Sequence, residues 1–293
     1  MKLRTPFSIT ALAAVGAFAI AACGGSSSPS GSNNNTGGTT AATPKAALLQ
    51  AASASTAEAG YRVKYTISAS TAEGNFSGIG TGTFNRSPQN GAVQLSLTGL
   101  PEIGSAQMSL VTSGSTIYID AASLLSHLPS ADAGLASGYL HGKSWLEINL
   151  SSLKSAAGGL GSLASTYSGF SKPGSYLKYL AAAGNIKKVG SATINGIATT
   201  EYTADIDISK VAGLGAVAKD LPASEPVSIW IDGNNLVRQI TIDASSSTGS
   251  TAAAVSSDTT LDFLSYGPQA TPAIPSASET LNLSSLLSGH LGL

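Results

Sequence analysis

Apolar and polar residues alternate through several stretches of the chain. Tyr61, Val63, Tyr65 and Ile67 fall on one face of an extended segment, and charged or hydroxyl residues lie between them. This period of two predicts a half-buried antiparallel strand. Similar alternation, or runs of β-branched and aromatic residues, predicts further strands at 76–84, 93–98, 145–150 and 259–266.

Turn residues between apolar stretches predict three hairpins. Asn195-Gly196 is the strongest of these signals, within 188–208. A two-residue turn at Ser113-Gly114 is predicted within 108–120. It would pair Leu110 with Ile117 and Met108 with Ile119. A third turn at Gly233-Asn234, within 227–244, would pair Ile231 with Leu236, Ile229 with Arg238 and Val227 with Ile240.

A few short helices complete the pattern. The Ala-rich segment 44–59 begins with Pro44, which suits a first helical turn, and Asp120 can cap a helix over 121–128. Weaker patterns predict helices at 173–183, 212–221 and 281–293. Strands do not alternate with helices in the βαβ manner, so the predicted class is α+β with an antiparallel sheet. About ten strands in one sheet must curl and so leave a concave side, for which the helices are the available plugs.

Glycines occupy one face of the strand predicted at 76–84. Gly78, Gly80 and Gly82 stand between Phe76 and Phe84 and leave that face without side-chain bulk. Either the strand bends strongly or a helix packs close to it, or the gap leaves room for a ligand. The spacing is not a phosphate-binding loop, since no helix follows it.

The N-terminal 43 residues predict export and anchoring. Lys2 and Arg4 precede an apolar run over 7–22, which has the length of a signal peptide core. The run ends in Ile20-Ala21-Ala22-Cys23, which resembles the bacterial lipobox. The resemblance implies cleavage before Cys23 and lipidation of its thiol and amine. We therefore expect a signal peptide at 1–22, a lipidated Cys23 with an unstructured Gly/Ser/Asn/Thr tether at 23–43, and one domain at 44–293.

Composition excludes several functions. Only 11% of the residues are charged, and 15 Lys and Arg face 16 Asp and Glu, so a nucleic-acid partner is not expected. A single Cys excludes an internal disulfide and a Cys-rich metal site. The three His residues, His127, His141 and His290, show no metal-binding spacing, and no G-x-S-x-G nucleophile motif occurs. We expect neither an enzyme nor a cofactor, and His141 is predicted to lie in a loop.

Three stretches resemble a known family: WLEINLSSL at 145–153, GIATTEYTADIDI at 196–208 and PVSIWIDGNNLVR at 226–238. Together with the lipobox they resemble actinobacterial lipoproteins of the LppX/LprG type, whose fold is related to the Lol-pathway lipoprotein carriers. The resemblance implies a half-barrel sheet wrapped around helices, an apolar cavity that holds acyl chains of a lipid or glycolipid, and transport through the cell envelope. It also implies an extracytoplasmic, membrane-anchored location and an envelope export partner. The low-charge segment 245–257 departs from that pattern and reads as a loop insert.

An apolar sheet face could supply such a cavity. A chain of 16 carbons gains on the order of 12 kcal/mol on leaving water, so a carrier needs a large apolar cavity with few polar groups. The candidate lining residues are Tyr65, Ile67, Phe84, Leu95, Leu97, Leu110, Ile117, Ile119, Ile229, Ile231 and Ile240.

Each of these side chains could equally be ordinary core. Arg238 would share their face in the predicted register, either to contact an anionic head group or to extend along the sheet edge toward water. The alternative function is a cell-envelope interaction or sensor module without a lipid ligand.

Overall fold

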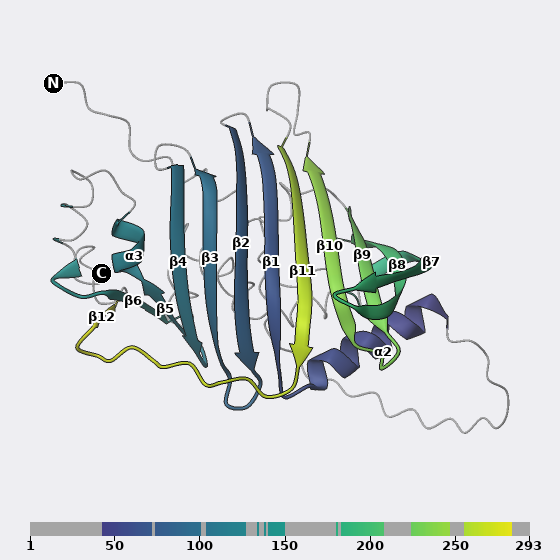
Figure 1. The fold of residues 1–293 in the computed structure, drawn as a ribbon, viewed down its shortest axis with the longest axis horizontal. Helices are drawn as coiled ribbons and strands as arrows, with labels where there is room; N and C mark the ends of the chain where they lie inside the picture. Colours follow the sequence, from purple (N-terminus) through teal and green to yellow (C-terminus); the bar gives the residue numbers. More distant parts are fainter. Residues whose placement is uncertain are drawn as a thin grey trace.

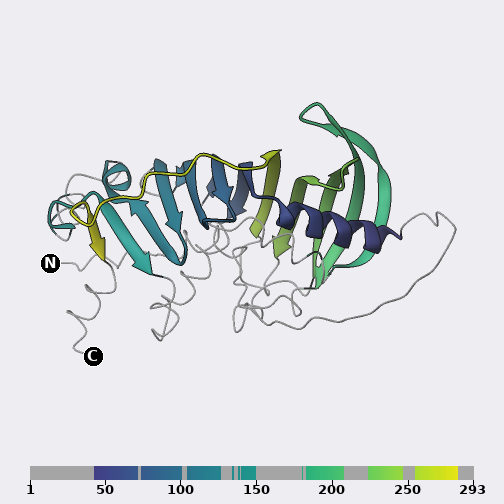
Figure 2. The same ribbon diagram turned by 90° about the horizontal axis from the view of Figure 1, so that it is seen from below.

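The computed structural model describes residues 43–71, 74–100, 104–126, 134, 138, 140–149, 180, 183–207, 224–246 and 255–282. Their main feature is one open sheet of twelve strands, with the order β12-β6-β5-β4-β3-β2-β1-β11-β10-β9-β8-β7 (Figure 1). The first and last strands of this order do not pair, so the sheet is unclosed. Figure 2 shows that the sheet curls most at its β9-β8-β7 end, where helix α2 lies alongside it.

The first half of the sheet is a meander of consecutive strands. Its strands are β1 (Gly60–Thr71), β2 (Gly74–Asn85), β3 (Asn90–Leu100), β4 (Gly104–Ser113), β5 (Thr116–Asp120) and β6 (Trp145–Asn149). The alternating residues of these strands pair antiparallel with their neighbours, as the sequence predicts.

The second half is built in the same way. Its strands are β7 (Ala183–Ile194), β8 (Ile197–Asp207), β9 (Ser224–Asp232), β10 (Val237–Ser246) and β11 (Val255–Tyr266). Strand β11 returns to pair with β1 and so joins the two halves. The last strand, β12 (Thr280–Asn282), crosses to the other edge and pairs parallel with β6. The prediction of a wholly antiparallel sheet is therefore wrong at this pair.

Helix α2 (Pro44–Ala57) confirms the predicted N-terminal helix to within two residues. The Thr43 hydroxyl caps it by accepting a hydrogen bond from the Ala46 amide at 3.3 Å. Near the C-terminal end of the helix the buried Ser55 hydroxyl accepts a hydrogen bond from the Val237 amide at 2.9 Å. This bond fastens α2 to the start of β10. Helix α3 (Ala121–Leu125) is capped by Asp120, whose Oδ1 accepts from the Ser123 amide at 3.0 Å.

Two of the three hairpins differ from their predicted registers. The Asn195-Gly196 turn is confirmed, with both residues at positive φ. The β4–β5 turn uses Gly114-Ser115, so Leu110 pairs with Ile119 rather than Ile117. Gly114 has φ +58°, which suits glycine at the first central position of a two-residue turn. That preference moves the turn by one residue from the predicted Ser113-Gly114.

The β9–β10 connection is longer than predicted. Asp232 Oδ1 accepts hydrogen bonds from the amides of Asn234 and Leu236 at 2.8 and 2.9 Å, which holds a loop over 233–236. A β-bulge then falls between Val237 and Gln239, so Val237 pairs with Ile231 and Ile240 with Ile229. The predicted pairs of Ile231 with Leu236, Ile229 with Arg238 and Val227 with Ile240 are therefore wrong.

Several other predicted helices and loops overlap with observed strands or fall on residues that the structure does not describe. The predicted helix at 173–183 ends in Ala183, which begins β7, and the predicted helix at 281–293 begins inside β12. The predicted insert 245–257 begins and ends in strands, since Ser245 belongs to β10 and Ser257 to β11. Apart from Leu180 and the residues of β10, β11 and β12, the remainder of these segments lies outside the described residues, as do the helix predicted at 212–221 and the N-terminal signal and tether at 1–42.

Candidate functional site

One face of the sheet is apolar across most of its width. Tyr65 begins one cross-strand row: Gly80, Leu95 and Met108 follow on one side, and Leu261, Ile240, Ile229 and Tyr202 on the other. Alternation places these residues on the same side of the pleat, and every side chain of the row except that of Met108 is buried. The row spans β4 to β8, so the apolar face belongs to the sheet as a whole.

Two parallel rows extend this face along the strands. Ile67 pairs with Gly78, and the row continues through Leu97 to Ala106. In the second row Val63 pairs with Gly82, and the row continues across the neighbouring strands through Val93, Leu110, Ile119 and Leu146. These rows confirm that the alternation in sequence sorts the apolar residues to one side.

The structure brings the predicted lining residues to this face, and all eleven are buried. Most belong to one large cluster: Tyr65, Phe84, Leu110, Ile117, Ile119, Ile229, Ile231 and Ile240. Leu95 and Leu97 form a second, smaller cluster with Ala106, and Ile67 a third with Ala69 and Phe76. Core residues and cavity-lining residues are both expected to be buried, so burial does not distinguish the two roles. A contact between these side chains and a ligand stays a prediction.

Neighbouring side chains fill the space above the glycines of β2. A Cβ at Gly78 would lie 2.7 Å from Leu97 Cδ2, and one at Gly82 would lie 2.7 Å from Phe84 Cε2. At Gly80 it would lie 2.5 Å from the Gln94 carbonyl oxygen. The space beside the glycines is therefore occupied by atoms of the same sheet. The sequence analysis proposed a bent strand, a closely packed helix or a ligand, and none of these describes this arrangement.

Arg238 is held by an ion pair. Its Nε donates to Asp232 Oδ2 at 2.7 Å, and its Cζ lies 5.3 Å from the centre of the Tyr266 ring. The bulge gives Val237 and Ile240 the inward positions of β10, with exposures of 0% and 2%. The register that placed Arg238 beside Ile229 is wrong, and its charge is paired within the sheet. The contact between Arg238 and a lipid head group stays a prediction. The strand register on which it was based no longer supports it.

A carboxyl group that the sequence analysis missed lies on the apolar face. Glu225 pairs with Ile206 and follows the inward phase of Val227, Ile229 and Ile231 along β9. It is 3% exposed, and its Oε1 has no hydrogen-bond partner. Burial raises the pKa of Glu225 from 4.5 to about 7. Extending the alternation of β9 back by two residues would have found it.

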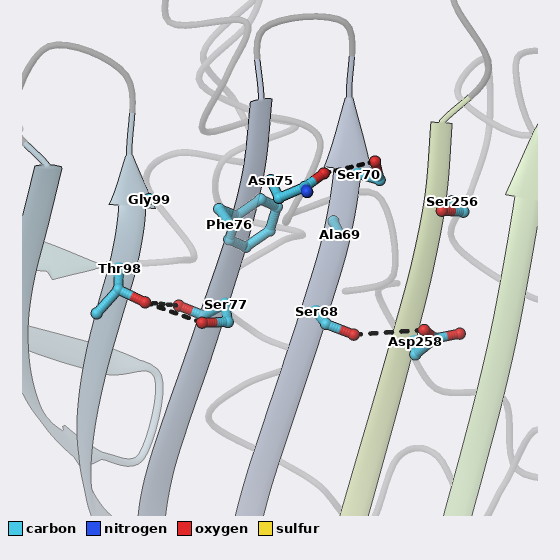
Figure 3. A pocket seen from close by; sticks show the side chains of 10 residues that line it. All are labelled: Ser68, Ala69, Ser70, Asn75, Phe76, Ser77, Thr98, Gly99, Ser256 and Asp258. Carbon is cyan, nitrogen blue, oxygen red and sulfur yellow. Dashed lines mark hydrogen bonds between the residues drawn. The ribbon is translucent and has the colours of Figure 1, made fainter.

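The opposite face of the sheet is polar and carries two open hollows. One, of about 380 Å³, lies near the end of β1, β2, β3 and β11 (Figure 3). Hydroxyl and amide groups there bond mainly to one another: Ser70 donates to Asn75 Oδ1 at 2.6 Å, and the Ser77 and Thr98 hydroxyls lie 2.8 Å apart. The other hollow, of about 510 Å³, surrounds the exposed Ile79. In the first hollow the Ser68 hydroxyl also donates to Asp258 Oδ2 at 3.3 Å, in an exposed position (Figure 3).

In the described part of the chain, no group of three or more His, Cys, Asp or Glu side chains gathers in a metal-binding arrangement. His141 is exposed in a turn, as predicted. Among the described helices none has the length and apolar character needed to cross a membrane. Cys23, His127 and His290 lie outside the described residues.

The fold and this site define a protein with an open sheet and one extended apolar face. No family model matches the sequence. A curated protein of Streptomyces griseus, described as an uncharacterized 31.2 kDa protein in the rplA-rplJ intergenic region, is 28% identical over 162 residues. The match covers 50% of each sequence, so the chain spans about half the length of this relative.

Two mycobacterial lipoproteins are among the similar solved structures. LppX of Mycobacterium tuberculosis matches 78% of this chain and 97% of its own, at 17% identity and a TM-score of 0.43. LprF of Mycobacterium bovis matches 80% of this chain and 97% of its own, at 12% identity and a TM-score of 0.43. The predicted resemblance to lipoproteins of this type is confirmed.

Proposed function

We propose that this protein is a membrane-anchored lipoprotein that binds acyl chains of a lipid or glycolipid against its apolar sheet face and helps to move the lipid through the cell envelope. The anchor is Cys23, at the extracytoplasmic face of the cell membrane. The protein acts by binding rather than by catalysis and needs no cofactor. An export partner in the envelope would supply or receive the lipid.

One observation carries the proposal: the apolar face runs without interruption from β4 to β8 in the row through Tyr65. Apolar groups contribute about 25 cal/mol per Å² removed from water, without demanding any particular orientation. A continuous strip of largely apolar residues therefore suits hydrocarbon chains of varied structure. Lipidation of Cys23, which the lipobox predicts, would tether this face near a membrane that contains such chains.

A specific observation favours the alternative of an envelope interaction or sensor module without lipid. Leu97 fills the space over Gly78, and Phe84 fills the space over Gly82. Ile229 and Leu261 are fully buried in the large cluster. If the whole face is packed in this way, the protein's own side chains bury its apolar surface and no lipid is needed to cover it.

Native mass spectrometry of the protein, produced without residues 1–23 in the host of the natural sequence or a related actinobacterium, separates these functions. We expect mass increments that organic extraction identifies as lipid. A homogeneous apoprotein that takes up no lipid from vesicles would refute the proposal and leave the interaction module.

A matched pair of variants tests whether the face binds the lipid. Leu97 lies in the small cluster with Leu95 and Ala106, whereas Ile229 is 0% exposed in the large cluster. We expect Leu97→Arg to retain the native circular dichroism spectrum and cooperative unfolding but to lose bound lipid. Ile229→Arg should abolish folding, because a buried unpaired charge in the core is far more costly. A folded Leu97→Arg protein with undiminished lipid content would show that lipid binds elsewhere.

A further inference from the structure

The apolar face has two unlike ends. At the end where β1 and β10 begin, aromatic side chains cluster on the apolar face. The ring centre of Tyr61 lies 5.4 Å from that of Phe84 and 5.7 Å from that of Phe263. Phe263 stacks at 5.8 Å on Tyr266, whose ring also meets Arg238. This end therefore presents hydrocarbon and aromatic ring faces, and the cation that meets its ring cluster, Arg238, is paired with Asp232.

The other end of the same face carries buried polar groups. Glu225 is the second residue of β9, and Ser257 is the third of β11, on the inward side of its strand. Both are buried, at 3% and 8% exposure. Strand β10 separates them, so their backbones lie about 10 Å apart, which is two strand spacings. Glu225 Oε1 lacks a hydrogen-bond partner, although nearly all buried polar atoms in folded proteins have one.

We propose that Glu225 is the head-group residue of the lipid site and accepts a hydrogen bond from a hydroxyl group at the polar end of an uncharged lipid. The bound lipid then lies with its hydroxyl end toward Glu225 and Ser257 and its hydrocarbon toward the aromatic end. This assignment rests on the proposed function. It replaces an anionic head group at Arg238 with a neutral hydrogen-bond donor at the opposite end of the face.

The local charges favour an uncharged donor over an anion. The charged residues nearest to Glu225 in the described parts of β8 and β10, Asp205, Asp207 and Asp243, alternate to the opposite face of the sheet. A phosphate on the apolar face would therefore meet the Glu225 carboxyl group with no unpaired cation beside it on the described parts of β8 and β10. An ammonium group would have to lose its hydration in an apolar row, and that loss opposes its attraction to the carboxyl group. A hydroxyl group costs less to bury and bonds to the carboxyl group whether or not it is protonated.

Three lipids with the same acyl chains test the inference. Dipalmitoylglycerol has a free hydroxyl, its O-acetyl ester has none, and dipalmitoyl phosphatidic acid carries an anion. Each is delivered from cyclodextrin to the delipidated protein, and the bound lipid is measured by native mass spectrometry. We expect the hydroxyl lipid to bind about tenfold more tightly than the ester, since one otherwise unpaired buried group is satisfied. Phosphatidic acid should bind most weakly.

Variants at Glu225 identify the residue responsible. Glu225→Leu should bind dipalmitoylglycerol and its ester equally. Glu225→Gln keeps an acceptor, so it should retain the hydroxyl preference while binding phosphatidic acid better than the natural protein does. Asp243→Asn is the matched control, because it removes the same charge from an exposed position of β10 and should leave all three affinities unchanged.

Two results would overturn the inference while the proposed function stands. One is equal binding of the hydroxyl lipid and the ester by the natural protein, and the other is a hydroxyl preference that persists in Glu225→Leu. If the natural protein and both variants bind none of the three lipids, the proposed function itself fails.

Discussion

Replacing Glu225 by Gln should change how the stability of the lipid-free protein depends on pH. Gln has nearly the same volume and cannot ionise, so the substitution removes one titrating group from an otherwise unchanged face. The folded-state pKa of Glu225 is about 7, against 4.5 for the same group in the unfolded chain. Between these two values the folded protein binds more protons than the unfolded one. Its stability contribution is therefore complete below about pH 4.5 and is lost as the pH rises to about 7.

The size of the effect follows from the same two pKa values. A rise from 4.5 to about 7 corresponds to an upper limit of about 3 kcal/mol. Glu225 lies near the end of its strand, where water and backbone relaxation reduce the cost of a charge, so we expect about 1 to 2 kcal/mol. The natural protein should lose that much more unfolding free energy than Glu225→Gln between pH 4.5 and 7.5.

Urea denaturation at the two pH values measures this difference. Other titrating groups are common to both proteins and cancel in the comparison. Lipid must be removed first, because a ligand that binds only the folded state adds its own stabilisation. If both proteins lose the same free energy between pH 4.5 and 7.5, the carboxyl group is solvated or paired in solution, and the assignment of a buried unpaired acid is wrong.

Three further experiments test the packing and the loop. Gly80→Ala should cost about 1 to 3 kcal/mol by urea denaturation because its Cβ meets the Gln94 carbonyl, whereas Gly190→Ala, with open space, should change stability by less than about 0.5 kcal/mol. Asp232→Ala should lower the free energy of unfolding, measured by thermal denaturation, by about 3 kcal/mol, because it leaves the Arg238 charge and two loop amides unpaired. Equal stability of the two proteins would show that the ion pair is solvated. Ser55→Ala removes the acceptor of a buried amide and should cost about 1 to 3 kcal/mol, with faster hydrogen exchange in α2.

The sequence was most informative where local preference and burial agree. Tyr65, Ile67, Leu95 and Leu97 fall on the apolar face because side chains alternate in any strand, whichever strand lies beside it. The Asn195-Gly196 turn formed as predicted because both residues accept positive φ at little cost. Such features depend on neighbours in sequence, so one chain suffices to predict them.

Features that depend on distant partners were missed. Strand β12 is only three residues long, and its parallel pairing with β6 depends on a crossing that no local pattern encodes. The space over Gly78 is occupied by Leu97, whose identity as the neighbour follows from the β2–β3 register rather than from the glycine spacing. Whether a glycine marks a ligand site or a closely packed side chain is thus decided by register.

The register of β10 has the largest consequence for function. Counting strictly by twos from the β9–β10 turn places a cation, Arg238, on the apolar face and so favours an anionic lipid. Asp232 holds a longer loop through two backbone amides, and the bulge that follows gives the inward positions to Val237 and Ile240. The charge of Arg238 is then neutralised by Asp232, and the ionisable group left on the apolar strip of β9 and β10 is the carboxyl of Glu225. One inserted residue in a strand therefore changes the expected head group from an anion to a hydrogen-bond donor.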